Sequence, residues 1–351
     1  MRKKTLLIPL ALLLAASLVA CAAPTPAPAP APAPEVINWK LQTYEPAGSV
    51  GFKQTTKIAD WVAAASDGRL KIEVFSGGAV VPEGEELQGV DKGVLEAACS
   101  SPAYHLKLFP QANLFAGMCG GLTCAQLALW FEDGGGTELA ERMYEPLNVK
   151  LIGTRVNTGE TWAMSNVRLE SLSDLEGWKF RTAGDSGEVF ASMGVATTFI
   201  PGGETYQAME TGVIDACEYG SPSTNWSMAF HEVSKYHYMS PSRLPGTADH
   251  FFVNGDVWAE LPLDLQEIVK LAIDRMLMTN WSDRVYLDSI YLIKTADYGV
   301  EILPLPRDIE DAVLRQADIF YGEKGAGDPF YAEILESIRE TRRICEEQGI
   351  R

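Results

Sequence analysis

Residues 201–220 read PGGETYQAMETGVIDACEYG, and residues 82–101 read PEGEELQGVDKGVLEAACSS. The two stretches align without a gap when Pro82 is placed on Pro201. Identical residues then coincide along the run: Gly84 with Gly203, Glu85 with Glu204, Gln88 with Gln207, Gly93 with Gly212, Val94 with Val213 and Ala97 with Ala216. Two copies are too few for a solenoid, which needs about three repeats to bury a continuous core. The repeat therefore predicts two similar lobes.

Each copy has the pattern of a helix followed by a strand. Pro and Glu stand in the opening turn of the helix, and Gly93 or Gly212 stands at its end. The apolar runs that follow, 95–99 and 213–219, are typical of strands. Strand and helix patterns alternate in the same way from residue 36 onward. This alternation predicts an α/β fold with largely parallel sheets.

The length of 351 residues also favours two domains, because a single core usually stops growing before that size. We predict one lobe over residues 36–155 with 247–262, and a second over 156–246 with 299–351. Residues 263–298 contain neither Gly nor Pro and predict one long helix that bridges both lobes. Two lobes joined at chain crossings leave a central cleft, where small molecules usually bind.

The first residues predict export. Residues 1–20 combine a basic start with a short apolar run, as in a signal peptide. The ending Leu-Val-Ala-Cys resembles a bacterial lipoprotein box, which implies a lipid on Cys21. The Pro/Ala-rich linker that completes residues 21–35 predicts an extended spacer of roughly 40 Å at about 3.1 Å per residue. We therefore expect a lipid-anchored protein in the periplasm or on the outer cell surface.

Charge and motifs exclude several functions. With Lys+Arg 29 and Asp+Glu 47 the net charge is −18, which argues against nucleic acid or an anionic membrane as partner. The sequence lacks the nucleophile elbow, the phosphate loop and the zinc-protease motif. After Cys21 five cysteines remain, so at least one thiol is unpaired or pairs between chains. A bridge between Cys119 and Cys124 is one option that the sequence leaves open.

Two charged residues at predicted strand ends are candidates for ligand binding. Arg181 ends the strand in GWKFR, where its guanidinium can hold a carboxylate by two hydrogen bonds, unless it is a surface residue. Glu218 closes a buried strand, where a carboxylate needs a cation, a donor or a ligand. A structural ion pair is the alternative. Further candidates for the cleft are aromatic residues and a second arginine that is otherwise expected at the surface: Tyr44, Tyr104, Trp162, Tyr219, Trp226 and Arg155.

Several longer motifs carry a resemblance to a known family. They are LKIEVFSGGAVVP (70–82), DLEGWKFR (174–181), GVIDACEY (212–219), and KYHYM, LPGT, FFVN and LP before the long helix. Over residues 36–320 the chain resembles the solute receptors of tripartite ATP-independent periplasmic (TRAP) transporters, the DctP family. It is most similar to the branch that binds 2-oxo and 2-hydroxy acids. The resemblance implies a two-lobed periplasmic-binding-protein-like fold that closes on a small carboxylate, with Arg181 as its clamp.

The resemblance also implies a metal site that this sequence matches only in part. In that branch a glutamine, a Glu-Trp pair and a glutamate before Pro-Gly-Thr hold the metal. Here Glu218 and Tyr219 occupy the pair, but Thr161 and Leu244 stand at the other two positions. Na⁺ and Ca²⁺ prefer about six to eight oxygens. We therefore expect no cofactor, with Glu218 and Tyr219 as metal ligands only if a cation is bound, and with Glu218 bonded to a hydroxyl or amine of the ligand.

The sequence thus predicts a receptor that captures a small organic acid (2-oxo, 2-hydroxy or sugar-acid-like) and delivers it to the membrane permease of a TRAP transporter. No covalent chemistry is expected. The predicted substrate-binding residues are Arg181, Glu218, Tyr219, Thr161, Trp162, Tyr104 and Tyr44. Alternatives are a receptor for an ATP-driven importer, a sensor lobe, or a secreted enzyme that uses Glu218 with Asp215 or Glu160 as acid and base.

Overall fold

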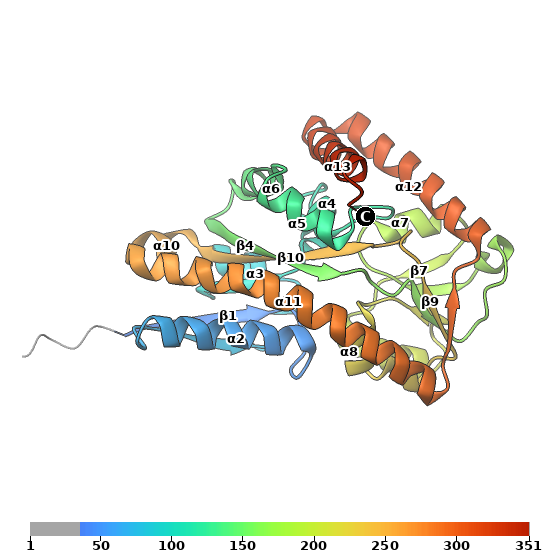
Figure 1. Ribbon diagram of the computed structural model, residues 1–351, viewed down its shortest axis with the longest axis horizontal. Helices are drawn as coiled ribbons and strands as arrows, with labels where there is room; N and C mark the ends of the chain where they lie inside the picture. Colours follow the sequence, from blue (N-terminus) through green and yellow to red (C-terminus); the bar gives the residue numbers. More distant parts are fainter. Residues whose placement is uncertain (1–35, 351) are drawn as a thin grey trace, which may run out of the picture. The chain divides into compact units, whose positions relative to one another are not determined.

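Two separate sheets organise the computed structural model, which describes residues 36–350 (Figure 1). The predicted signal peptide, Cys21 and the linker lie outside the described residues. The first sheet has the strand order β2-β1-β3-β10-β4, and the second has the order β11-β9-β5-β8-β6-β7. The predicted two-lobed α/β fold is therefore confirmed, whereas the exact lobe boundaries stay a prediction.

The first sheet is parallel where the strands come early in the chain. β1 (Ile37–Thr43) pairs in parallel with β2 (Leu70–Phe75) and with β3 (Ala97–Ser100). β10 (Gly246–Asn254) runs antiparallel between β3 and β4 (Val149–Thr158). The two positions near residues 156 and 247, where the chain is predicted to cross between the lobes, thus lie on neighbouring strands, β4 and β10.

The second sheet repeats this mixture with shorter strands. β6 (Lys179–Arg181) lies in parallel between β7 (Ala196–Thr198) and β8 (Ala216–Cys217). β5 (Ala163–Ser165) is antiparallel to β8 and to β9 (Tyr236–Met239). At the far edge β11 (Glu301–Pro304) pairs in parallel with β9.

The sequence repeat contributes the same unit to each sheet. The first copy forms α3 (Glu86–Asp91) and β3, and the second forms α8 (Gly202–Glu210) and β8. Gly93 and Gly212 have φ of 69° and 70°, a left-handed conformation that glycine adopts without steric cost. The turn therefore has the same form in both copies and feeds a parallel strand in each sheet.

Shorter helices cover the sheets. On the chain segments of the first sheet they are α2 (Val50–Ala65), α4 (Asn113–Ala116), α5 (Cys124–Glu132), α6 (Gly136–Tyr144) and α10 (Gly255–Glu260). On those of the second sheet they are α7 (Ser186–Ala191) and α9 (Pro222–Ser227). The last two helices, α12 (Arg307–Gly327) and α13 (Pro329–Glu347), diverge in their contacts: α12 packs on α7, and α13 packs on α5 and α6. The C-terminal segment thus contacts elements of both sheets.

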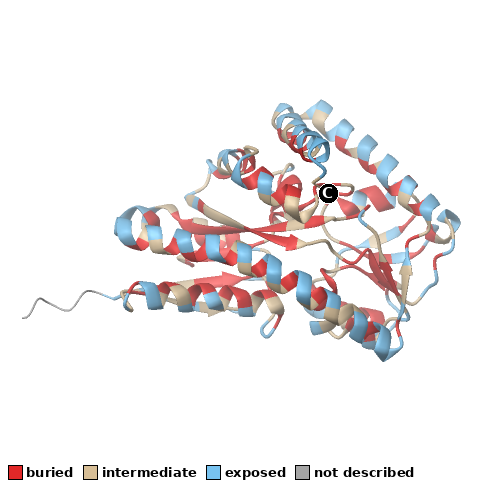
Figure 2. Cartoon of the chain, in the orientation of Figure 1, coloured by how far each residue is buried: buried red, intermediate tan, exposed pale blue. Residues whose placement is uncertain are grey.

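α11 (Leu263–Tyr298) is one helix of 36 residues, over the bounds predicted from the sequence. Figure 2 shows buried and exposed residues alternating along this helix. The buried ones change from apolar to polar along its length. The first half buries apolar residues such as Val269 and Ile273 in the core of the first sheet. The second half buries Arg284, which donates to Thr224 Oγ1 at 2.7 Å, and Asp288, which accepts from Ser221 Oγ at 2.8 Å. Apolar packing therefore holds α11 to the first sheet, and polar contacts hold it to Ser221 and Thr224, which follow β8 of the second sheet.

All five cysteines of the described residues are free thiols, so the optional bridge between Cys119 and Cys124 is not formed. Within residues 36–350 no helix combines the length and the apolar character needed to cross a membrane.

Arg155, which the sequence favours as a surface residue, is fully buried on β4 instead. Its Nη2 donates to Asp249 Oδ2 at 2.7 Å and to Glu45 Oε2 at 2.8 Å. Nη1 donates to the Gly51 carbonyl at 3.2 Å. The guanidinium has no surface role and joins β4, β10 and the loop after β1 into one ion network.

We expect Arg155→Met to lower the free energy of unfolding by about 3–5 kcal/mol, because Asp249 and Glu45 would stay buried with less compensation. Urea denaturation measures this loss. The matched control is Arg343→Ala, which breaks an exposed ion pair with Glu340 and should leave the midpoint unchanged. Equal midpoints for the two variants would contradict a structural role of the Arg155 network.

Candidate functional site

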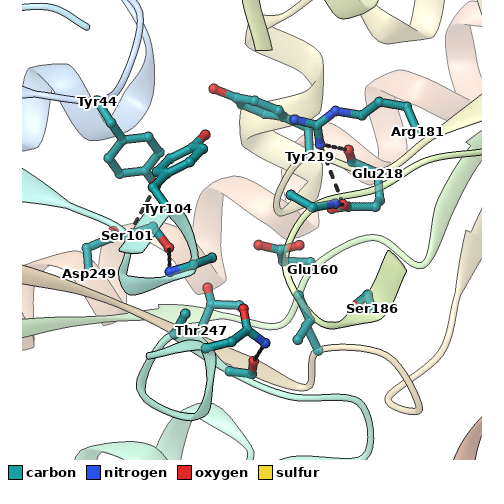
Figure 3. A pocket seen from close by; sticks show the side chains of 16 residues that line it. Tyr44, Ser101, Tyr104, Glu160, Arg181, Ser186, Glu218, Tyr219, Thr247 and Asp249 are labelled. Carbon is teal, nitrogen blue, oxygen red and sulfur yellow. Dashed lines mark hydrogen bonds and ion pairs between the residues drawn. The ribbon is translucent and has the colours of Figure 1, made fainter. Parts of the chain in front are cut away.

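A cavity of about 80 Å³ lies where the ends of parallel strands from the two sheets face each other. Five of the predicted residues line it: Tyr44, Tyr104, Arg181, Glu218 and Tyr219 (Figure 3). Tyr44 follows β1, Arg181 ends β6 and Glu218 follows β8. Ligands of open α/β sheets bind at the carboxyl ends of strands. The cavity has the position that this rule predicts.

Arg181 is buried, and protein groups already hold most of its guanidinium. Nε donates to the Ile200 carbonyl at 2.9 Å, and Nη1 donates to the Glu218 carbonyl at 2.6 Å. The guanidinium also lies over the rings of Tyr219 and Phe199, at 5.3 and 5.6 Å from their centroids. Among residues 36–350 no hydrogen bond is found for Nη2. Arg181 is thus fixed in place with one N–H₂ group left for a ligand.

Glu218 is buried beside two arginines. Its Oε1 accepts from the Ala183 amide at 2.7 Å, and its Oε2 lies 3.0 Å from Arg243 Nη1. Burial alone would raise the pKa of Glu218, but the charges of Arg243 and Arg181 hold it below its usual value. The carboxylate is therefore ionised, and both of its oxygens have protein partners.

Glu160 and Arg243 belong to the same cluster, although the sequence singles out only Glu160, and only for the enzyme alternative. Arg243 is fully buried, and its Nη2 donates to Glu160 Oε2 at 2.5 Å and to the Thr161 carbonyl at 2.9 Å. Burial and the nearby charge of Glu218 raise the pKa of Glu160 to about 7, against the effect of Arg243. Both residues lie in connecting loops, where no periodicity reveals the direction of a side chain.

Besides Arg155, three of the predicted residues do not line the cavity. Thr161 is buried with Oγ1 at 3.0 Å from His237 Nε2. Trp162 is buried in an aromatic stack, 6.0 Å from Trp178 between ring centroids. Trp226 stacks on His231 at 3.7 Å. Glu160, the residue before Thr161, does line the cavity, because neighbouring side chains of an extended chain point in opposite directions. A ligand contact of Thr161 stays a prediction.

Aromatic side chains close the cavity from both sheets. Tyr44 donates to Asp249 Oδ1 at 3.1 Å, and its ring meets Tyr104 edge to face at 5.5 Å. Tyr104 in turn meets Phe199 at 6.4 Å, so the two halves touch above the cavity. A side chain at Gly202 would collide with the Tyr219 ring, since its Cβ would lie 2.3 Å from Cε2. The glycine therefore lets the ring lie against the start of α8.

Tyr219 carries a second unused group. Its Oη is buried and has no hydrogen-bond partner among the described residues. A buried hydroxyl without a partner is costly, and this one lies against the start of α8, where an added Cβ at Gly202 would be 2.6 Å from it. Arg181 Nη2 and Tyr219 Oη are thus two donors, on residues that line the cavity, for which no hydrogen bond to another described residue is found.

An arginine, Arg243, occupies the centre of this group of oxygens. Among residues 36–350 no three His, Cys, Asp or Glu side chains are grouped to hold a metal ion. The oxygens of Glu160, Glu218 and the Thr161 carbonyl, which would suit a hard cation, surround the guanidinium of Arg243 instead. The residues present therefore do not fit a bound Na⁺ or Ca²⁺.

A small polar cavity between two α/β sheets, lined by a buried arginine, is the arrangement of two-lobed solute receptors. The family model for bacterial extracellular solute-binding protein family 7, DctP, matches residues 41–322, so this chain belongs to that family. The resemblance inferred from the sequence is confirmed. The protein is an extracytoplasmic solute-binding receptor.

Individual relatives support the same placement. The monocarboxylate 2-oxoacid-binding periplasmic protein of Nostoc sp. is 26% identical over 307 residues, which cover 88% of this chain and 84% of the relative. A TRAP periplasmic solute-binding protein of Colwellia psychrerythraea, solved with calcium and pyruvate, has a TM-score of 0.84 at 28% identity. That of Pseudoalteromonas atlantica, solved with sodium and pyruvate, has a TM-score of 0.84 at 26% identity. Each structure match covers 90% of this chain and 96% of the other.

We expect Glu160→Gln to flatten the dependence of stability on pH. The pKa of Glu160 is about 7 in the folded protein and about 4.3 in an unfolded chain, so the folded state binds the extra proton between these values. The free energy of unfolding therefore decreases as the pH rises from about 4 to about 7. Burial raises the pKa of Glu86 and Asp185 to about 7 as well, so part of the slope should remain.

Urea titrations at several pH values between about 5 and 8 measure the slope of stability against pH. The exposed Glu138→Gln serves as control and should keep the full slope. An unchanged slope in Glu160→Gln would show that Glu160 does not titrate in this range.

Proposed function

We propose that this receptor captures a small 2-oxo or 2-hydroxy monocarboxylate, such as pyruvate or lactate, and delivers it to the permease of a TRAP transporter. The observation that carries the proposal is a pair of donors without a partner among the described residues, Arg181 Nη2 and Tyr219 Oη, on two residues that line the cavity. A carboxylate accepts at Arg181, and a second oxygen of the ligand accepts from Tyr219. The pyruvate and 2-oxoacid named for the relatives have this arrangement of oxygens.

The size of the cavity supports a short acid. A volume of about 80 Å³ holds about five to eight water-sized groups, at about 10–15 Å³ for each. A three- or four-carbon acid has that number of heavy atoms. A sugar acid has about twice as many and would have to extend into the adjoining cavity of about 500 Å³, which shares Ala103, Tyr104 and Ala183, so we propose the shorter acid.

The charges around the cavity support a single negative charge on the ligand. Arg243 pairs with Glu160 and Glu218, and Arg155 pairs with Asp249 and Glu45. Arg181 is then the cation that the ligand meets, while Glu160, with its pKa near 7, donates to a 2-oxo oxygen when protonated or accepts from a 2-hydroxy group when ionised. We assign Glu218 to the positioning of Arg181 rather than to direct contact with the ligand, because both of its oxygens are already engaged.

We expect the two lobes to close on the ligand, because the residues that line the cavity come from both sheets. Tyr44 and Tyr104 come from the first sheet, and Arg181 and Tyr219 come from the second. A ligand held between the two sets binds the closed form more tightly than the open one and so shifts the population toward it. The permease would then recognise the closed receptor. A lipid anchor at Cys21 is part of this proposal, although the residue lies outside the described range.

The enzyme alternative has less support. Asp215 does not line the cavity, and its Oδ2 accepts from the Lys179 amide at 3.0 Å. Glu160 and Glu218 do lie together, but Arg243 bonds to Glu160 and lies between the two. We therefore propose binding without turnover. Recovery of unchanged pyruvate after prolonged incubation, followed by proton NMR, tests this point.

Arg181→Lys is expected to weaken pyruvate binding by about 10- to 100-fold, because one charge-assisted hydrogen bond contributes about 1.5–3 kcal/mol. Isothermal calorimetry measures the change. Lysine keeps the charge and is preferred to alanine, since Arg181 also binds two carbonyl groups of the protein. Arg142→Ala, at an exposed ion pair, is the control. Wild-type affinity in Arg181→Lys would remove the residue from the ligand contact.

Tyr219→Phe separates binding from folding more sharply. The substitution removes only the hydroxyl, which has no partner, so the unliganded protein should unfold at the same temperature or slightly higher. Pyruvate affinity should decrease by about tenfold, the value of one hydrogen bond of about 1.5 kcal/mol. Thermal unfolding with and without pyruvate gives both quantities. If Tyr219→Phe unfolded at a lower temperature than the wild type in the absence of pyruvate, the hydroxyl would have a structural role instead.

A further inference from the structure

We propose that Arg243 is a built-in cation of the binding site, which takes the place of a metal ion, so that ligand binding here needs neither Ca²⁺ nor Na⁺. The inference rests on the proposed function, because it concerns the same cavity. The inference goes beyond that function because it identifies the group that neutralises the carboxylates of the site.

The guanidinium occupies a position that has the oxygen donors of a cation site. Three oxygens lie around it: Glu160 Oε2 at 2.5 Å, the Thr161 carbonyl at 2.9 Å and Glu218 Oε2 at 3.0 Å. Two carboxylates and one backbone carbonyl are the ligand types that hard cations prefer. A metal ion and the Arg243 side chain would therefore compete for the same oxygens.

The loop that carries Arg243 is fixed on both sides, so the side chain is held where it is. The Ser242 carbonyl accepts from the Gly120 amide at 2.8 Å, and the Leu244 carbonyl accepts from the Glu160 amide at 2.9 Å. Pro241 and Pro245 restrict the backbone at either end of the short loop. The side chain itself is fully buried. Because removal of the charge would leave two buried carboxylates close together, the arginine is also needed electrostatically.

The balance of charge supports the same view. Glu160 and Glu218 carry two negative charges when ionised, and Arg243 and Arg181 carry two positive charges. A divalent metal added to this set would leave a buried excess of positive charge. The four groups are therefore neutral as a set, without a metal, before a ligand binds.

Two relatives, unlike the site described here, were solved with a metal ion bound. The Colwellia psychrerythraea protein was solved with calcium and pyruvate, and the Pseudoalteromonas atlantica protein with sodium and pyruvate. In this chain Thr161 contributes a carbonyl to Arg243 and its hydroxyl to His237, and Leu244 has no side-chain oxygen. The positive charge inside the site thus comes from the chain itself.

The test begins with Ca²⁺ and Na⁺ alone, added to the full chain after dialysis against a chelator. We expect no shift in the thermal unfolding of the wild type and no heat of binding in calorimetry. Pyruvate should then bind with the same affinity in chelator as in Ca²⁺. Stabilisation of the wild type by Ca²⁺ alone, or pyruvate binding that disappears in chelator, would overturn the proposal.

Two variants complete the test. Arg243→Met releases the two carboxylates and the carbonyl, so this variant should be stabilised by Ca²⁺ where the wild type is not. Arg243→Lys keeps the charge and should remain insensitive to Ca²⁺. A folded Arg243→Met that gains no Ca²⁺ response would also overturn the proposal. If that variant does not fold, the wild-type measurements with Ca²⁺ alone still decide.

Failure of the proposed function would look different. In that case no organic acid would stabilise the wild type, with or without Ca²⁺, while the experiments with Ca²⁺ alone would still show whether Arg243 excludes a metal.

Discussion

The need to compensate charges that are buried where the two sheets meet determines much of this structure. Arg155 pairs with Glu45 and Asp249, and Arg243 pairs with Glu160 and Glu218, all with little exposure to solvent. A buried charge is tolerated only when it is paired and hydrogen-bonded. Each network joins segments that are far apart in the chain. The ends of the strands are therefore held together by ion pairs that cannot be separated cheaply.

These networks also make the cavity specific. Because Glu218 is occupied by Arg243 and the Ala183 amide, and Arg181 is held by two carbonyl groups, the groups left open to the cavity are few and fixed. Donors that are already oriented lose little freedom when a ligand binds, which favours affinity for a small anion. α11 contributes at longer range, since its apolar half packs in the first core and its polar half binds the loop that follows β8.

Several features of the site could be predicted from the sequence, because they depend on local pattern. Arg181 and Glu218 stand at the ends of predicted strands, and both line the cavity. The resemblance points to Thr161, whereas Glu160 is the residue of this loop that lines the cavity. Arg243 was missed altogether, because it lies in a loop 83 residues from Glu160 and nothing in its own neighbourhood points to a buried partner.

Local sequence patterns are enough to predict the α/β class, the duplicated helix–turn–strand unit and the long helix at 263–298. Each of these follows from periodicity, from turn glycines such as Gly93 and Gly212, or from the absence of Gly and Pro, and all of these act within a few residues. Which charges meet in the cavity, and which aromatic residues face it, depends on the folded arrangement. Those choices depend on packing between segments that are distant in the chain, where the free energy of burying a charge selects its partner.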